Sequence, residues 1–135
     1  EQRMNFDQAE ADIRKHFDSE WSGLTPIAWP DLPFDKPDST WVRFDCREND
    51  GFQATIGAPG SNAFRHTGIC TIQVFQPQGQ ASQDARDKAQ KAIEAFQGVD
   101  VNGIHFFNVQ ARQVGNDRGW YQINVLASFR YDEIT

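Results

Sequence analysis

The stretch GICTIQVFQPQGQASQDARDKAQKAIEAF, from Gly68 to Phe96, joins two different patterns of apolar residues. Residues 65–76 alternate between apolar and polar, which predicts a strand with one apolar face. Residues 83–97 instead carry an apolar stripe, mostly of alanines, at helical spacing. Residues 77–80 are typical of a turn. The chain is therefore predicted to leave a sheet and to return across its apolar face as a packed helix.

The same order of strand, glycine-containing turn and helix also occurs in phosphate-binding loops. A P-loop needs the pattern GxxxxGK followed by Ser or Thr, because its backbone amides and its lysine hold the phosphate. Here the turn reads PQGQASQ, with one glycine and no lysine, and the dinucleotide-binding pattern GxGxxG is missing as well. The sequence therefore favours a plain strand-to-helix crossover, with Ser82 as the helix N-cap.

Two segments at the start of the chain carry further apolar residues. Residues 5–22 place them at three- and four-residue steps, which predicts a helix capped by Asn5 or Asp7 and ended by Gly23. Residues 24–38 contain four prolines and are predicted to form an extended arm. The apolar side chains of the arm are Ile27, Trp29, Leu32 and Phe34. They pack either on the chain's own core or on a neighbouring subunit.

The remaining strands are predicted at residues 40–46, 52–56, 104–113 and 120–131. The Asn-Asp-Gly sequence within residues 48–51 is typical of a tight turn, as are residues 115–119, and GAPGSN at residues 57–62 is typical of a loop. This order predicts an α+β fold in two layers, with a mainly antiparallel sheet of about five strands and two helices packed on one face.

The composition fits one domain, which we expect to span residues 4–132, with residues 1–3 as an extension. The polar start predicts no signal peptide, and no apolar run is long enough to cross a membrane. A net charge of −6 without a basic run argues against nucleic-acid binding, sequence-specific binding included. Cys46 and Cys70 are interpreted as buried thiols, with a disulfide as the alternative.

The residue types that carry chemistry occur here without the spacing that chemistry needs. His16, His66 and His105 have no HxxxH or HxH partner, and no GxSxG elbow is present. The acidic residues around Glu48 lie at a predicted turn, where carboxylates are common. We therefore predict no catalytic residue, no cofactor and no metal, and a protein that is not an enzyme.

The second face of the predicted sheet is polar but carries little charge. Aromatic side chains and arginines accompany amides and hydroxyls there, which is the composition of protein interfaces. The residues predicted on this face are Trp41, Arg43, Asp45, Thr71, Gln73, Phe75, Phe106, Asn108, Gln110, Arg112, Trp120, Gln122, Asn124, Ser128 and Arg130. We expect the protein to associate with itself.

Taken together, these segments resemble a known family. The amphipathic first helix is followed by TPIAWPDLPF, WVRFDC, RHTGICTIQVFQPQGQASQDARDKAQKAIEAF and a closing GWYQINVLASFRYD. This order resembles the phage tail terminator-like proteins, minor tail proteins of bacteriophages and prophages that are similar to the lambda tail terminator. The resemblance spans Met4 to Asp132. Its most specific residues are Trp29-Pro30 and, before the Ala-rich helix, Gly68, Val74, Phe75, Pro77 and Gly79.

The resemblance implies a virion structural protein of α+β fold. Such terminators form a hexameric ring that caps the head-proximal end of the tail tube, stops its polymerisation and offers a surface to the head connector. The implied partners are further copies of the chain, the tail tube protein and a head-completion or connector protein. The implied location is the tail of the virion, after assembly in the cytoplasm of the bacterial host.

Subunit contacts are predicted in the arm and in residues 57–65. The residues concerned are Ile27, Trp29, Leu32, Phe34, Phe64 and Arg65. The residues predicted to face the tube or the passing DNA are Arg112, Arg118 and Arg130.

Other classes of function stay open at this point. A head-completion protein is the alternative within the virion. A small-molecule-binding or enzymatic α+β domain would place a pocket between helices and sheet, and a cluster of buried acids or histidines would favour it. An interaction module of a cellular complex is the third class.

Overall fold

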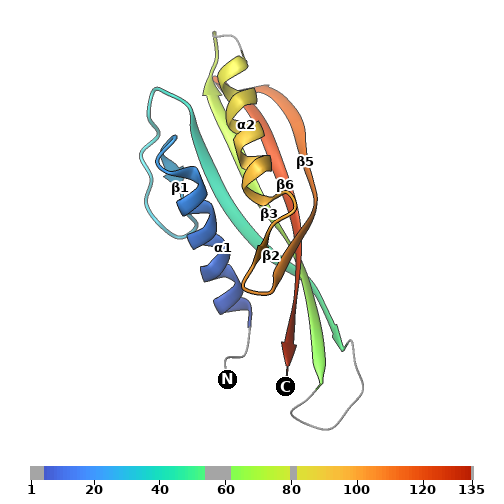
Figure 1. Ribbon diagram of the computed structural model, residues 1–135. Coiled ribbons are helices and arrows are strands. Elements are labelled where there is room, and N and C mark those ends of the chain that lie inside the picture. Colours follow the sequence, from blue (N-terminus) through green and yellow to red (C-terminus); the bar gives the residue numbers. More distant parts are fainter. Residues whose placement is uncertain (1–4, 54–61, 80–81, 135) are drawn as a thin grey trace.

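Six strands form one twisted sheet, and two helices cover one of its faces (Figure 1). The computed structural model describes residues 5–53, 62–79 and 82–134. The elements are α1 (Phe6–Trp21), β1 (Ile27–Ala28), β2 (Trp41–Gln53), β3 (Ala63–Pro77), α2 (Gln83–Phe96), β4 (Asp100–Val101), β5 (Ile104–Asp117) and β6 (Trp120–Ile134). Their order in the sheet is β1-β2-β3-β6-β5-β4. β1 pairs in parallel with β2, and the other pairings of these strands are antiparallel. The predicted α+β fold is confirmed, with six strands instead of five.

The predicted turn at residues 48–51 is wrong, because β2 continues through it. Glu48 lies opposite Gly68 and Asp50 opposite Thr67, so Asn49 is the one extra residue of a β-bulge. The turn-forming sequence is accommodated as a bulge within the strand, because β3 is long enough to pair with β2 both before and after Asn49. Phe52 and Gln53, predicted to begin a separate strand at residues 52–56, are therefore the end of β2. Residues 54–56 of that predicted strand and residues 57–61 of the predicted loop lie outside the described residues.

The core forms where the apolar faces of β2, β3 and β6 meet the apolar stripes of both helices. Every second residue is buried from Val42 to Cys46 in β2, from Gly68 to Gln76 in β3 and from Ile123 to Tyr131 in β6, as the alternation predicts. Phe17 of α1 lies at the centre: its ring centroid is 5.5 Å from that of Phe44 on β2 and 5.8 Å from that of Phe96 on α2. Because burial of each such side chain stabilises the fold by roughly 1.5–3 kcal/mol, this aromatic cluster holds the helix layer on the sheet.

In the first half of β5, the side chains lie on the opposite faces of the sheet from those predicted. Phe106 is buried in the core, whereas Phe107 is 39% exposed and lies opposite Ser128. The register shifts by one residue between Phe107 and Gln110, and Asn108 there has a φ of 52°. Asparagine tolerates this left-handed conformation. The bulge reverses the alternation, so a strict period of two assigns the residues before it to the wrong face.

The two helices begin in different ways. The side chain of Asn5 accepts a hydrogen bond from the backbone N–H of Gln8 at 2.9 Å, which confirms it as the cap of α1. Ser82 occupies the N-cap position of α2, as predicted, but its side chain makes no capping hydrogen bond. Instead Oε1 of the fully buried Gln76, on β3, accepts from the backbone N–H of Ala85 at 2.7 Å. A side chain of the strand that precedes α2 thus accepts a hydrogen bond from one of the unpaired backbone N–H groups in the first turn of the helix.

Cys46 and Cys70 are free thiols that face each other across β2 and β3. Both are buried, and the Cys70 thiol donates to Sγ of Cys46 at 3.5 Å. Burial raises the pKa of Cys70 well above its ordinary value, and the contact with Cys46 adds to this rise. The interpretation as buried thiols is confirmed.

Gly68 is required by close packing between three strands. A Cβ at this position would lie 2.3 Å from the carbonyl oxygen of Arg47 and 2.4 Å from Cζ of Phe129. We expect Gly68→Ala to lower the free energy of unfolding by about 1–3 kcal/mol, since overpacking forces the strands apart. Urea denaturation measures this loss. Thr67→Ser on the same strand, which keeps the hydroxyl that donates to Oδ1 of Asn49, is the control, with an expected change of less than about 0.5 kcal/mol. Equal midpoints for the two variants would contradict the steric argument.

Candidate assembly surfaces

The arm, residues 24–38, runs along the β1 edge of the molecule and is anchored on the core (Figure 1). Ile27 is partly buried within β1 and packs against the core. Trp29 is also partly buried, with its ring centroid 5.4 Å from that of Phe44 and 6.3 Å from that of Phe17. These two side chains therefore pack on their own chain.

The outer part of the arm divides into one packed and one free apolar side chain. Phe34 lies 4.9 Å from Trp41, centroid to centroid. Leu32, by contrast, is 59% exposed. Of the four apolar side chains of the arm, Leu32 is thus the one with most surface left for a second molecule.

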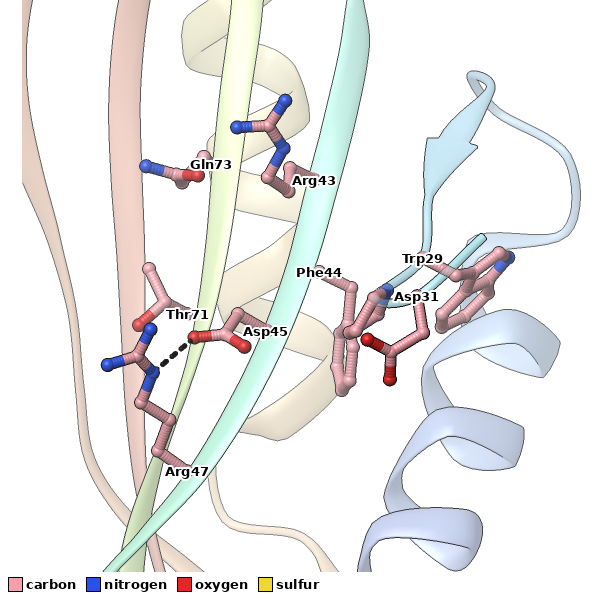
Figure 2. A pocket seen from close by; sticks show the side chains of 9 residues that line it. Trp29, Asp31, Arg43, Phe44, Asp45, Arg47, Thr71 and Gln73 are labelled. Carbon is pink, nitrogen blue, oxygen red and sulfur yellow. Dashed lines mark hydrogen bonds and ion pairs between the residues drawn. The ribbon is translucent and has the colours of Figure 1, made fainter. Parts of the chain in front are cut away.

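A groove of about 500 Å³ separates the arm from the sheet (Figure 2). It opens where β1 ends, because β1 pairs only with Val42 and Arg43 of β2. The lining residues are Trp29, Pro30, Asp31, Arg43, Phe44, Asp45, Arg47, Thr71 and Gln73. Nε of Arg47 donates to Oδ2 of Asp45 at 3.0 Å, which pairs two of the charges. The groove offers a mixed polar surface, without a convergent set of groups for a reaction.

The sheet face away from the helices aligns its side chains in rows across four strands. One row, in register, is Arg43, Gln73, Asn124 and Arg112, and the next is Asp45, Thr71, Leu126 and Gln110. In the first row two amides lie between two arginines, and in the second row Thr71 and Leu126 lie between Asp45 and Gln110. Trp41 departs from the prediction: it is 1% exposed because Phe34, Phe75 and Trp120 surround it.

The three arginines predicted to face the tube or DNA are exposed but do not form one cluster. Arg112 lies on the open face of β5, and Arg118 lies in the β5–β6 turn with a φ of 50°. Arg130 is on β6, opposite Thr67 and six residues from the partner of Arg112. At about 3.3 Å per residue, this places Arg112 and Arg130 roughly 20 Å apart along the sheet.

Arg65 and Phe64 lie on β3, near the far end of the sheet. Phe64 is half-buried opposite Glu133. Arg65 forms two hydrogen bonds with the Asp132 carboxylate, 2.9 Å from Nε and 3.1 Å from Nη2. This guanidinium, through its hydrogen bonds and its charge, lowers the pKa of Asp132. The pair connects β3 to β6, so Arg65 already has a partner within the chain.

A cluster around His66 connects three strands and was not predicted. Nδ1 of His66 lies 2.8 Å from Glu48 and Nε2 lies 3.1 Å from Glu133. The Tyr131 hydroxyl donates to the other Glu48 oxygen at 2.7 Å, and burial, followed by this bond, raises the pKa of Tyr131. No sequence motif marks these residues, because their contact depends on the register of β2, β3 and β6. The cluster connects the three strands in that register.

Within residues 5–53, 62–79 and 82–134, no group of three or more His, Cys, Asp or Glu residues is arranged to hold a metal ion. No helix in this part of the chain is long and apolar enough to span a bilayer.

Fold and surfaces define a small α+β protein with an anchored arm and an uncovered polar sheet face. The sequence matches the family of the phage tail terminator protein over residues 8–129. The chain therefore belongs to the phage tail terminator family, and it is a structural protein of the phage tail. The resemblance inferred from the sequence is confirmed.

Solved structures share this fold at low sequence identity, whereas no curated protein matched the sequence. One solved protein has a TM-score of 0.71 and 16% identity, with 95% of this chain and 96% of that chain covered. A second, from the virion of a native gene transfer agent particle, has a TM-score of 0.54 and 16% identity, with 91% and 93% covered. At this identity the likeness concerns the fold.

The arm allows a test that separates folding from assembly. Trp29→Ala is expected to lower the free energy of unfolding by about 2–3 kcal/mol, because it removes a ring from the aromatic cluster. Leu32→Ser is expected to change it by less than about 0.5 kcal/mol, because Leu32 is exposed. Urea denaturation of both variants measures the difference. A similar loss for both would show that the whole arm packs as one unit.

The Arg65–Asp132 pair predicts a pH-dependent contribution to stability. Because the pKa of Asp132 is lowered in the folded chain, the contribution is present above the ordinary value of 3.8 and is lost as the pH falls through the lowered pKa. Arg65→Met should therefore lower the urea midpoint slightly at pH 7, and the gap to the parent should close on acidification. Arg47→Met is the matched control in a more exposed pair. A gap that persists in acid would contradict this assignment.

Proposed function

We propose that this protein is the tail terminator of its phage or prophage. It caps the head-proximal end of the tail tube as a ring of identical subunits, hexameric by the resemblance, and joins the tube to the head. Its partners are further copies of itself, the tail tube protein and a head-completion or connector protein. Assembly takes place in the host cytoplasm, and the protein remains in the tail of the virion.

The family match carries this proposal, since it spans residues 8–129 and so includes both helices and nearly the whole sheet. The polar side chains support a structural role. The Arg65–Asp132 pair and the cluster around His66 connect neighbouring strands. They are occupied in holding the sheet, and we propose that the protein is not an enzyme.

The exposed surfaces suit contacts with several partners. In the proposed ring the arm lies at the subunit contact, with Leu32 as its most exposed large apolar side chain. Phe64 and Arg65, at the other end of the sheet, are the second candidate for a subunit contact. Arg118 and Arg130 are exposed and suit a contact with the tube or with the phosphates of the passing DNA, because guanidinium groups bind phosphate well.

Deletion of the gene from the parent phage or prophage tests the proposal. After induction, tail lengths are measured in negative-stain electron micrographs. Without a terminator, polymerisation of the tube has no stop, so we expect overlong tubes of uneven length beside filled heads that carry no tail. A plasmid copy of the gene should restore uniform tails.

The other outcomes assign other functions. Tails of normal length that stay separate from filled heads would indicate a head-completion protein. Normal tails joined to heads would exclude both virion roles and would leave a small-molecule-binding domain, with the groove beside the arm as its binding site.

A further inference from the structure

The exposed large apolar side chains of the described residues lie at two opposite sides of the molecule. Leu24 and Leu32, 46% and 59% exposed, belong to the arm beside β1. Phe107 and Val114, 39% and 51% exposed, belong to β5. In the sheet, β1 is the first strand and β5 lies next to the last, with only the two residues of β4 beyond it. Each side thus presents two apolar side chains that its own core does not use.

The two sides also differ in charge. Residues 5–38, which form α1 and the arm, contain eight carboxylates and three basic side chains, a net charge of −5. Residues 104–130, which are β5 and β6 up to Arg130, contain three arginines and one aspartate, a net charge of +2, although the whole chain is at −6. The two acids at the end of β6, Asp132 and Glu133, are paired with Arg65 and His66 of β3. Asp31, Asp35 and Asp38 on the arm are all exposed, as is Arg112 on β5. Opposite charges on two different patches favour contact of one patch with the other patch on a second copy.

The arm side offers a receptacle for an apolar side chain. A groove of about 380 Å³ lies between α1 and the arm. Its lining residues are Arg14, Lys15, Asp18, Trp29 and Leu32. Its exposed lining is more apolar than polar, with the indole of Trp29 and the side chain of Leu32 beside the stems of two basic residues. An entering apolar side chain would cover Leu32.

The β5 side is shaped to present side chains outward. β4 pairs only with Ile104 and His105, so from Phe107 onward no described strand pairs with the outer edge of β5. Two register shifts interrupt β5, one after Phe107 and one at Val114. Bulges re-aim side chains and disrupt a regular ladder. The outer edge of β5 is therefore better suited to contact through side chains than to extension of the sheet.

We propose that β5 of one copy docks against the arm of the next copy, with Val114 entering the groove beside Trp29 and Leu32 and Arg112 facing the acidic side chains of the arm. The contact joins two different patches, so repetition of it closes a ring if the rotation fits. This inference rests on the proposed function, in which the copies form such a ring, and it assigns the two surfaces that meet.

Cysteine cross-linking in assembled tails tests the contact. The deletion strain carries plasmid copies with Leu32→Cys, Val114→Cys or both, and isolated tails are treated with a short bismaleimide and examined on denaturing gels. The native thiols are buried and can stay. The double variant should give a ladder of covalent multimers, and neither single variant should give a homodimer. Leu32→Cys combined with Gln90→Cys, an exposed position on α2, is the control and should give none.

Three results would overturn the contact. Homodimers of either single variant would indicate a symmetric, isologous interface. Cross-linking of Val114→Cys to another tail protein would assign β5 to that partner. Absence of the ladder, for this pair and also for Leu32→Cys with Phe107→Cys, would exclude the contact in tails of normal length.

The terminator role and the contact between β5 and the arm can be rejected independently of each other. Tail length in the deletion strain reports on the terminator role, whereas the ladder reports only on which surfaces meet. Restored tails without the ladder would leave the terminator role in place and remove the proposed contact. A ladder from a strain whose deletion leaves tails normal would keep the contact and remove the terminator role.

Discussion

The ring of Phe17 is the point where four parts of the chain meet. It stacks on Phe44 of β2 and Phe96 of α2, and its neighbours are Trp21 of its own helix and Trp29 of the arm. Because α1, α2 and the arm share this one cluster, none of them can shift on the sheet without exposing aromatic surface. The helix layer is thereby confined to one face, and the other face of the four long strands stays uncovered. The surfaces available for assembly follow from that packing.

The periods of the apolar residues predicted most of this arrangement. Alternation placed Ile72, Val74 and Cys46 in the core, and helical spacing placed Ala89 and Phe96 against the sheet, where they are buried. The arm was recognised by its four prolines, because proline removes the N–H donors that a strand ladder needs. Such predictions succeed where the apolar period is unbroken over several helical turns or several strand residues. The element then has one apolar face, and burial of that face determines how the element is oriented on the core.

The rest depended on contacts between residues far apart in the sequence. Asn-Asp-Gly forms a bulge because β3 provides partners on both sides of it, and Phe106 is buried because Asn108 shifts the alternation. Gln76 caps α2 from a strand, which no local pattern indicates. The cluster around His66 likewise needs three strands in one register. For the candidate surfaces, the sequence identified the arm and the polar face, but only the exposed fractions separate Leu32 from its packed neighbours.

The central pairing of β3 with β6 has a consequence for how the chain reaches this state. The two strands pair from Pro77 with Trp120 at one end to Ala63 with Ile134 at the other, and all of α2, β4 and β5 lie between them in sequence. The loop to be closed is shortest at the Pro77 end and grows along the ladder, and so does its entropic cost. Non-local pairing of this kind slows folding relative to local hairpins. Until this pairing forms, newly made copies are expected to expose unpaired strand edges, which makes crowded conditions the more demanding ones for folding.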